Sequence, residues 1–193
     1  MGMYKKIALL SGLFCTLQRA SDIVIKPSYF FFSASPMKHI YHHGGFEIQA
    51  SVSGSCCDYF DLYGSVGCRK AWGRALNTCE KTSLTVVPID IGIKPTLNFC
   101  GRFYYFFAIG PRFFYFHQHN NSPYVDRIIN GGGVGLFVNT GFNVQLTDCF
   151  LLGIFGEYSY EKKTVCPKKP NVLSNGSIQI GGFAFGVSLG YVF

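Results

Sequence analysis

Apolar and polar residues alternate with a period of two along eight segments of the chain. In the last segment, every second residue from Phe183 to Phe193 is large and apolar, whereas the other face between Gly182 and Gly190 carries Gly, Ala and Ser. Such alternation is typical of β-strands with one apolar face. The sequence therefore predicts an all-β fold with strands at Ile23–Ser33, Gly45–Ser53, Tyr59–Cys68, Ser83–Pro95, Arg102–His117, Gly133–Gln145, Phe150–Tyr160 and Ser177–Phe193.

The connections between these segments alternate in length. Long connections of mostly polar residues alternate with short ones, and this alternation is typical of an antiparallel up-and-down barrel in an outer membrane. A β-sandwich, the alternative architecture, has no reason to alternate loop length so regularly. The long connections are Ser35–Gly44, Arg69–Thr82, Gln118–Asn130 and Glu161–Asn175, and the short ones are Gly54–Asp58, Thr96–Gly101 and Leu146–Cys149.

The charged residues of the predicted strands all fall on the face opposite the apolar one. A charge that faces lipid at mid-depth costs roughly 2–4 kcal/mol, whereas one that faces a polar lumen can be paired. The pattern predicts that the apolar face points outward and that four cations and four anions form an ion-pair network in the lumen. They are Lys26, Lys94, Arg102 and Arg112, and Glu47, Asp61, Asp90 and Glu157. Two interpretations stay open, a lumen plugged by this network and a narrow polar channel for small solutes.

The composition agrees with a membrane barrel. Hydrophobic residues make up 48% of the 193 residues and charged residues only 14%, against about 25% in ordinary soluble domains. No apolar run reaches the roughly 18 residues of a transmembrane helix. A single eight-stranded transmembrane β-barrel domain, residues 21–193, is the predicted organisation.

The first 20 residues resemble an export signal. Lys5 and Lys6 precede an apolar stretch from Ile7 to Leu17, and cleavage after Ala20 would release the mature chain. A buried N-terminal element is the alternative. Loss of this segment would lower the formal net charge of +7 by three.

Three short segments resemble those of known bacterial outer-membrane barrels. The last strand, which ends in an aromatic residue, resembles the C-terminal signal read by the barrel-assembly machinery, with Leu189, Tyr191 and Phe193 as its main residues. The segments 87–94 and 107–112 resemble the fourth and fifth strands of small OmpW-like and OmpX-like barrels. The resemblance to this OmpW/OmpX/OmpA-like superfamily implies an integral protein of the bacterial outer membrane with loops at the cell surface.

Seven cysteines remain once Cys15 leaves with the signal. The periplasm and the cell surface allow disulfides, and Cys68 and Cys79 could close the second long loop. The odd number leaves at least one thiol, so covalent cross-linking to other envelope proteins and local bridges plus a spare thiol both stay open. The disulfide candidates are Cys56, Cys57, Cys100 and Cys149 at the short turns, and Cys68, Cys79 and Cys166 at the long loops.

The long loops are predominantly basic. Phosphates of lipopolysaccharide and acidic host glycans are natural partners for such a rim, and a solvated fringe is the alternative. No motif indicates nucleic-acid binding. The basic residues are Lys38, Arg69, Lys70, Arg74, Lys81, Arg127, Lys162, Lys163, Lys168 and Lys169.

Catalytic and metal-binding patterns are weak. His117, His119 and Ser122 differ in spacing from the His-x-Ser-Asn pattern of lipid A deacylases, and His39, His42 and His43 have no firm fourth ligand for zinc. We therefore expect a non-enzymatic protein without metal or cofactor and with a structural, adhesin-like role at the surface. A narrow channel is the alternative function, and lipid A modification is less favoured.

Overall fold

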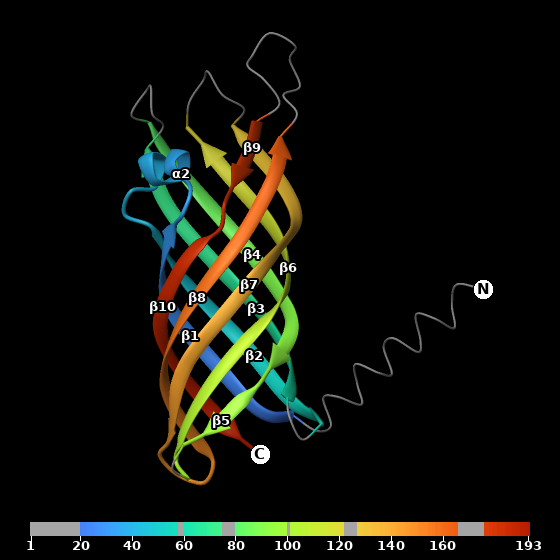
Figure 1. Cartoon of the computed structure of the whole chain (residues 1–193). Coiled ribbons are helices and arrows are strands. Elements are labelled where there is room, and N and C mark those ends of the chain that lie inside the picture. Colours follow the sequence, from blue (N-terminus) through green and yellow to red (C-terminus); the bar gives the residue numbers. More distant parts are fainter. Residues whose placement is uncertain (1–19, 58–59, 75–79, 100, 122–126, 166–175) are drawn as a thin grey trace, which may run out of the picture.

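The computed structural model describes residues 20–57, 60–74, 80–99, 101–121, 127–165 and 176–193, and within them the chain forms a closed antiparallel β-barrel (Figure 1). Figure 1 shows the C-terminus at one end of the barrel, here called the terminus end, and α2 at the other, the loop end. The eight long strands are β1 (Ala20–Phe32), β2 (Gly45–Cys57), β3 (Phe60–Arg74), β4 (Lys81–Lys94), β6 (Phe103–Asn120), β7 (Ile128–Gln145), β8 (Phe150–Val165) and β10 (Gly182–Val192).

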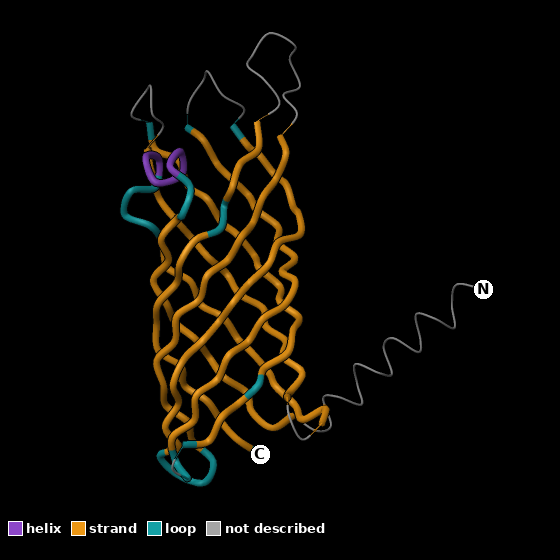
Figure 2. The backbone as a smooth tube through the Cα atoms, in the orientation of Figure 1, coloured by secondary structure: helices purple, strands orange, loops and turns teal. Residues whose placement is uncertain are grey.

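The barrel closes because β10 pairs with both β1 and β8. A path through paired residues that leaves β7 at Val144 passes through β8, β10, β1, β2, β3, β4 and β6, and it returns to β7 at Val134, ten residues away. Such a stagger requires strongly tilted strands, and Figure 2 shows this tilt. Eight strands leave an interior just wide enough for side chains.

Side chains alternate between the two faces of the barrel wall, with large apolar ones outside. Ile154, Val134 and Phe46 are each more than 60% exposed, whereas Arg112, Glu161 and other ionisable groups are buried inside. This arrangement is the inverse of a water-soluble protein. Outward aromatic residues gather toward both ends, as in membrane barrels: Phe103, Phe150, Tyr191 and Phe193 toward the terminus end, and Phe31, Phe46, Trp72, Tyr115, Tyr160 and Phe183 toward the loop end.

The eight predicted strands are confirmed, but several extend farther toward the loop end. β3 continues to Arg74 and β8 to Val165, where it pairs with the short β9 (Gly176–Gln179). Pairing of the backbone carries on beyond the apolar belt, where the outward residues become polar and the alternation fades. Two further elements lie in predicted connections: α2 (Ser35–Ile40) in the first long loop and β5 (Thr96–Asn98) in a short turn.

Three strand prolines each interrupt the hydrogen-bond ladder on one side only. β1 and β10 are not paired at Pro27, β3 and β4 are not paired at Pro88, and β4 and β6 are not paired at Pro111. Each proline keeps its partner on the other side, because it lacks an N–H group but retains its carbonyl oxygen. The barrel therefore tolerates prolines that would end an ordinary central strand.

We predict that the barrel tolerates large residues on its outer face but not on its narrow inner one. At inward Gly141, a Cβ atom would lie 2.9 Å from ring atoms of buried Phe106, whereas at outward Gly64 the nearest atom is Val52 Cγ1 at 3.8 Å. Gly141→Leu should destabilise the barrel by roughly 1–3 kcal/mol through overpacking, and Gly64→Leu should be close to neutral. Urea unfolding, read from gel mobility of unboiled against boiled samples in detergent, measures both. Equal midpoints for the two variants would contradict the assigned faces.

Candidate functional site

Arg112 on β6 organises the charged layer inside the barrel. Its Nε and Nη2 atoms donate to the two carboxylate oxygens of Asp90 at 2.6 and 2.7 Å. Nη2 also donates to Glu157 Oε1 at 2.6 Å, and Nη1 to Glu161 Oε1 at 3.2 Å. The guanidinium is fully buried. Because charge-assisted hydrogen bonds of this kind are short and directional, Arg112 ties together β4, β6 and β8.

Arg69 on β3 forms a second centre in the same layer. Its Nε and Nη2 atoms donate to the carboxylate of Glu47 at 3.1 and 3.3 Å, and Nη1 donates to Glu161 Oε1 at 3.3 Å. Its guanidinium lies over the ring of Phe30, 3.5 Å from the centroid. Glu161 therefore joins the Arg69 and Arg112 centres into one network that spans the interior.

Neutral groups complete the coordination of the anions. Gln49 and Asn139 donate their amide protons to Glu157, and the Ser65 hydroxyl donates to Asp90 at 2.6 Å. Lys26 donates to the hydroxyl oxygen of Tyr63 at 3.2 Å. Buried ions are tolerated only when they are paired and hydrogen-bonded. Each carboxylate of this layer accepts at least one charge-assisted hydrogen bond from Arg69 or Arg112, whereas Glu161 Oε2 has no hydrogen-bond partner among the described residues.

The structure separates the predicted network residues into groups. Lys26, Glu47, Asp90, Arg112 and Glu157 lie in the central layer. Lys94 lies nearer the terminus end, where it donates to Asp22 at 2.6 Å and to Ser53 at 2.9 Å. Asp61 is partly exposed at that end and accepts from Ser55.

The assignment of Arg102 to the network is wrong. Arg102 is exposed in the turn that precedes β6, because that strand begins at Phe103 rather than at Arg102. Two of the central residues were expected in loops instead: Arg69 and Glu161 continue the inward period of β3 and β8, two residues beyond Gly67 and Ser159. Extending the period-two alternation of these two strands beyond their last predicted residues would have predicted both side chains to point inward.

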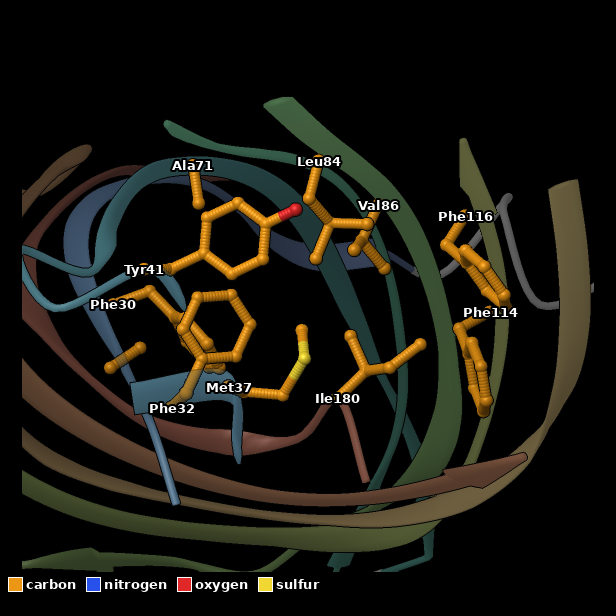
Figure 3. Packing of buried hydrophobic residues seen from close by; sticks show 11 residues of the cluster. Phe30, Phe32, Met37, Tyr41, Ala71, Leu84, Val86, Phe114, Phe116 and Ile180 are labelled. Atoms are coloured by element: carbon orange, nitrogen blue, oxygen red, sulfur yellow. The ribbon is translucent and has the colours of Figure 1, made fainter. Parts of the chain in front are cut away.

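A hydrophobic cluster closes the loop end of the lumen above the charged layer (Figure 3). Helix α2 supplies Met37, and Tyr41 directly after the helix packs beside Phe32. The Tyr41 hydroxyl lies 3.3 Å from Thr82 Oγ1, and burial raises the pKa of this hydroxyl above its ordinary value. The cluster consists of Phe30, Phe32, Met37, Tyr41, Ala71, Leu84, Val86, Phe114, Phe116, Ile180 and Ala184.

The chain segment after α2 folds back onto the wall at Gly44. This glycine has a φ of +69°, and a Cβ atom there would lie 2.1 Å from the carbonyl oxygen of Phe30. The Tyr29 hydroxyl donates to the carbonyl oxygen of His43 just before it. The end of the first loop is thus fixed to the wall beside β1 by the backbone conformation of Gly44 and by this hydrogen bond.

The cysteines and histidines do not converge on a site within the described part of the chain. Cys68 and Cys149 are free thiols there, and Cys68 faces outward within β3, which continues beyond the predicted strand end at Cys68 to Arg74. Cys79, Cys100 and Cys166 lie outside the described residues, as does Ser122, whereas Cys56 and Cys57 end β2. His117 Nδ1 lies 2.6 Å from Asn130 Oδ1. Among the described residues, no three His, Cys, Asp or Glu side chains are grouped so that they could hold a metal ion.

Most of the predicted basic rim lies at the loop end. The prediction was wrong for Arg69, which is buried in the charged layer. Lys168 and Lys169 lie outside the described residues, and Lys163 is half-buried. The exposed cations are Lys38, Lys70, Arg74, Lys81, Arg127 and Lys162.

Comparison with known proteins shows the fold. No protein-family model matches the sequence, and no curated protein matches it either. Neisserial surface protein A matches with a TM-score of 0.60 at 14% identity, over 89% of this chain and 96% of that one. Ail, the attachment invasion locus protein of Yersinia pestis, solved with the heparin analogue sucrose octasulfate, matches with a TM-score of 0.52 at 11% identity, over 89% and 98%.

These likenesses confirm the predicted architecture: the eight long strands form a closed antiparallel β-barrel with the same fold as these two proteins. No helix among the described residues is long and apolar enough to cross a membrane. The outward apolar belt is the surface that a barrel of this fold presents to lipid.

We predict that the charged layer is sensitive to the loss of one arginine. Arg112→Met would leave Asp90, Glu157 and Glu161 short of a buried cation, and removing one partner of a buried pair costs roughly 3–5 kcal/mol. Arg102→Met, at the exposed arginine, should be neutral. The free energy of unfolding in urea, measured for both variants in the same micelles, checks this. Equal stability of the two variants would show that the network does not hold the barrel together.

Proposed function

We propose that the barrel is a closed anchor and that its loop end is a surface that binds acidic partners, in the manner of an adhesin. The observation that carries this proposal is the filled lumen. The Arg112 and Arg69 centres occupy its middle, and the α2 cluster caps its loop end (Figure 3). With the interior used for packing, the exposed loop end is the part of the molecule left for interaction.

Export and assembly follow from the same proposal. Residues 1–20 would act as the signal peptide that sends the chain across the inner membrane. Leu189, Tyr191 and Phe193 would then be read by the barrel-assembly machinery, and their exposure on the outer face of β10 and at its end supports this role. The termini would face the periplasm and the loop end the exterior, as in other barrels of this kind.

The charge of the loop end indicates the class of partner. Its exposed lysines and arginines would attract lipopolysaccharide phosphates and acidic host glycans. The charged layer inside the barrel has the opposite balance, with Glu47, Asp90, Glu157 and Glu161 against Lys26, Arg69 and Arg112. That Ail was solved with a heparin analogue supports an acidic-glycan partner for a barrel of this fold.

A narrow channel is the second candidate, because the lumen is lined by polar and charged side chains. The salt bridges across the interior disfavour it, since an ion would have to displace paired groups. The surface role also requires no catalytic group, and we propose a non-enzymatic protein. Cysteines outside the described residues remain candidates for cross-linking to other envelope proteins.

We predict that the barrel does not conduct. Reconstituted into planar bilayers, it should show no ion current above the lipid background, because the network and the α2 cluster fill the lumen. Steady single-channel openings in the wild type, lost together with the charge of Lys26, would favour the channel instead.

We predict salt-sensitive binding of sucrose octasulfate at the loop end. Replacing Lys38, Arg74, Lys81 and Arg127 together by Gln should weaken binding at least tenfold, because each exposed cation adds a modest attraction that salt screens. Calorimetric titration in detergent micelles measures the affinity. Arg102→Gln at the terminus end is the control and should bind like the wild type. If the fourfold variant binds normally, the loop cations do not form the binding surface.

A further inference from the structure

The outward wall of the barrel carries a groove of about 590 Å³ across β10, β1, β2 and β3. Two rows of residues on neighbouring strands line it, and they are paired across each ladder except between Val187 and Pro27. Phe185, Tyr29, Phe46 and Lys70 form the row nearer the loop end, and Val187, Pro27, Ile48 and Cys68 form the row nearer the terminus end. Glu47 also contributes to the lining, but its carboxylate is buried and paired with Arg69. The groove is therefore almost wholly apolar except at Lys70.

The groove forms because two residues of the row nearer the terminus end have small side chains. Pro27 and Cys68 present small side chains beside the large rings of Tyr29, Phe46 and Phe185. The β1–β10 ladder is interrupted at Pro27 as well. Because the strands are tilted, a row of residues that crosses neighbouring strands is inclined to the barrel axis. This row approaches the loop end as it passes from β10 to Lys70 on β3. Three interstrand spacings give the groove a length of about 14 Å, which accommodates most of a fatty acyl chain.

Lys70 lies at the upper end of the groove without an ion-pair partner among the described residues. It faces outward on β3, although it was expected in a loop, and its Nζ atom lies 5.4 Å from the centroid of the Trp72 ring. Tryptophan at this place is typical of the boundary between hydrocarbon and headgroups. An outward cation beside it lies where a lipid headgroup carries its negative charge.

The cationic face continues beyond Trp72. Arg74 is exposed on the same side of β3, four residues from Lys70, and Lys81 is its paired neighbour on β4. The distance along the strand from Lys70 to Arg74 is about 13 Å, too far for one phosphate to contact both closely. The spacing suits a headgroup with two separated phosphates.

We propose that this groove and its cations bind lipid A, the phosphorylated, multiply acylated lipid of the leaflet that faces the loop end. One acyl chain lies in the groove between the two rows, one phosphate contacts Lys70, and the second phosphate contacts the Arg74 side. The proposal rests on the membrane location and orientation proposed above, and it assigns one defined site to the lipid partner of the loop end.

The experiment uses Trp72, the single tryptophan of the chain, as its reporter. The refolded full barrel in maltoside micelles is titrated with diphosphoryl lipid A while Trp72 emission is followed, and native mass spectrometry counts the bound lipids. Lys70→Gln should raise the Kd about tenfold, the loss expected for one charge-assisted contact to phosphate. Lys70→Arg should retain binding, and Cys68→Phe, which fills the groove, should weaken binding as much as Lys70→Gln.

Arg102→Gln is the matched control, because Arg102 is an exposed cation at the terminus end that does not line the groove. Its Kd should stay within twofold of the wild type. Dephosphorylated lipid A and inorganic phosphate should each bind far more weakly, since each lacks one half of the ligand.

Equal affinity of the Lys70, Cys68 and Arg102 variants would overturn the site, and so would phosphatidylglycerol that binds as tightly as lipid A. These outcomes differ from a failure of the membrane proposal. In that case the wild type would stay soluble without detergent and would migrate identically with and without boiling.

Discussion

Arg112 shares its guanidinium protons among carboxylates on two strands, and the rest of the interior is arranged around this contact. A fully buried arginine is tolerated only where anions surround it, and a buried carboxylate only where donors do. The anions around Arg112 are Asp90, Glu157 and Glu161. Additional donors to these carboxylates are Ser65, Gln49 and Asn139. Arg69 extends the same chemistry to β2 and β3.

The barrel divides its interior into layers with different physical roles. The charged layer fixes the strands to one another through directional hydrogen bonds, and the apolar cluster around Met37 and Tyr41 closes the loop end by packing. A smaller pair of Lys94 and Asp22 lies nearer the terminus end. These layers are therefore held by two kinds of contact, ion pairs in the middle of the lumen and apolar packing at its loop end.

The outer wall is less uniform than its apolar composition suggests. Prolines at positions 27, 88 and 111 each break one ladder while keeping the other, so the wall contains local gaps without losing closure. Near Pro27 the gap coincides with small side chains and becomes a groove. Lys70 and Trp72 lie at its upper end, where the apolar belt meets the cations of the loop end.

The sequence by itself determined the strands and the face that each residue occupies, because side chains alternate with a period of two wherever a chain is extended. It thereby predicted that Lys26, Glu47, Asp90, Arg112 and Glu157 point inward. It did not determine which of them meet. Arg69 and Glu161, 92 residues apart, share a hydrogen bond only because closure of the barrel and its ten-residue stagger bring β3 and β8 face to face across the lumen. The helix in the first loop and the groove on the outer wall likewise depend on residues from several strands. The alternation along a strand specifies which face of the wall each side chain occupies. The position of that side chain along the barrel axis and its neighbours on other strands are set only when the barrel closes.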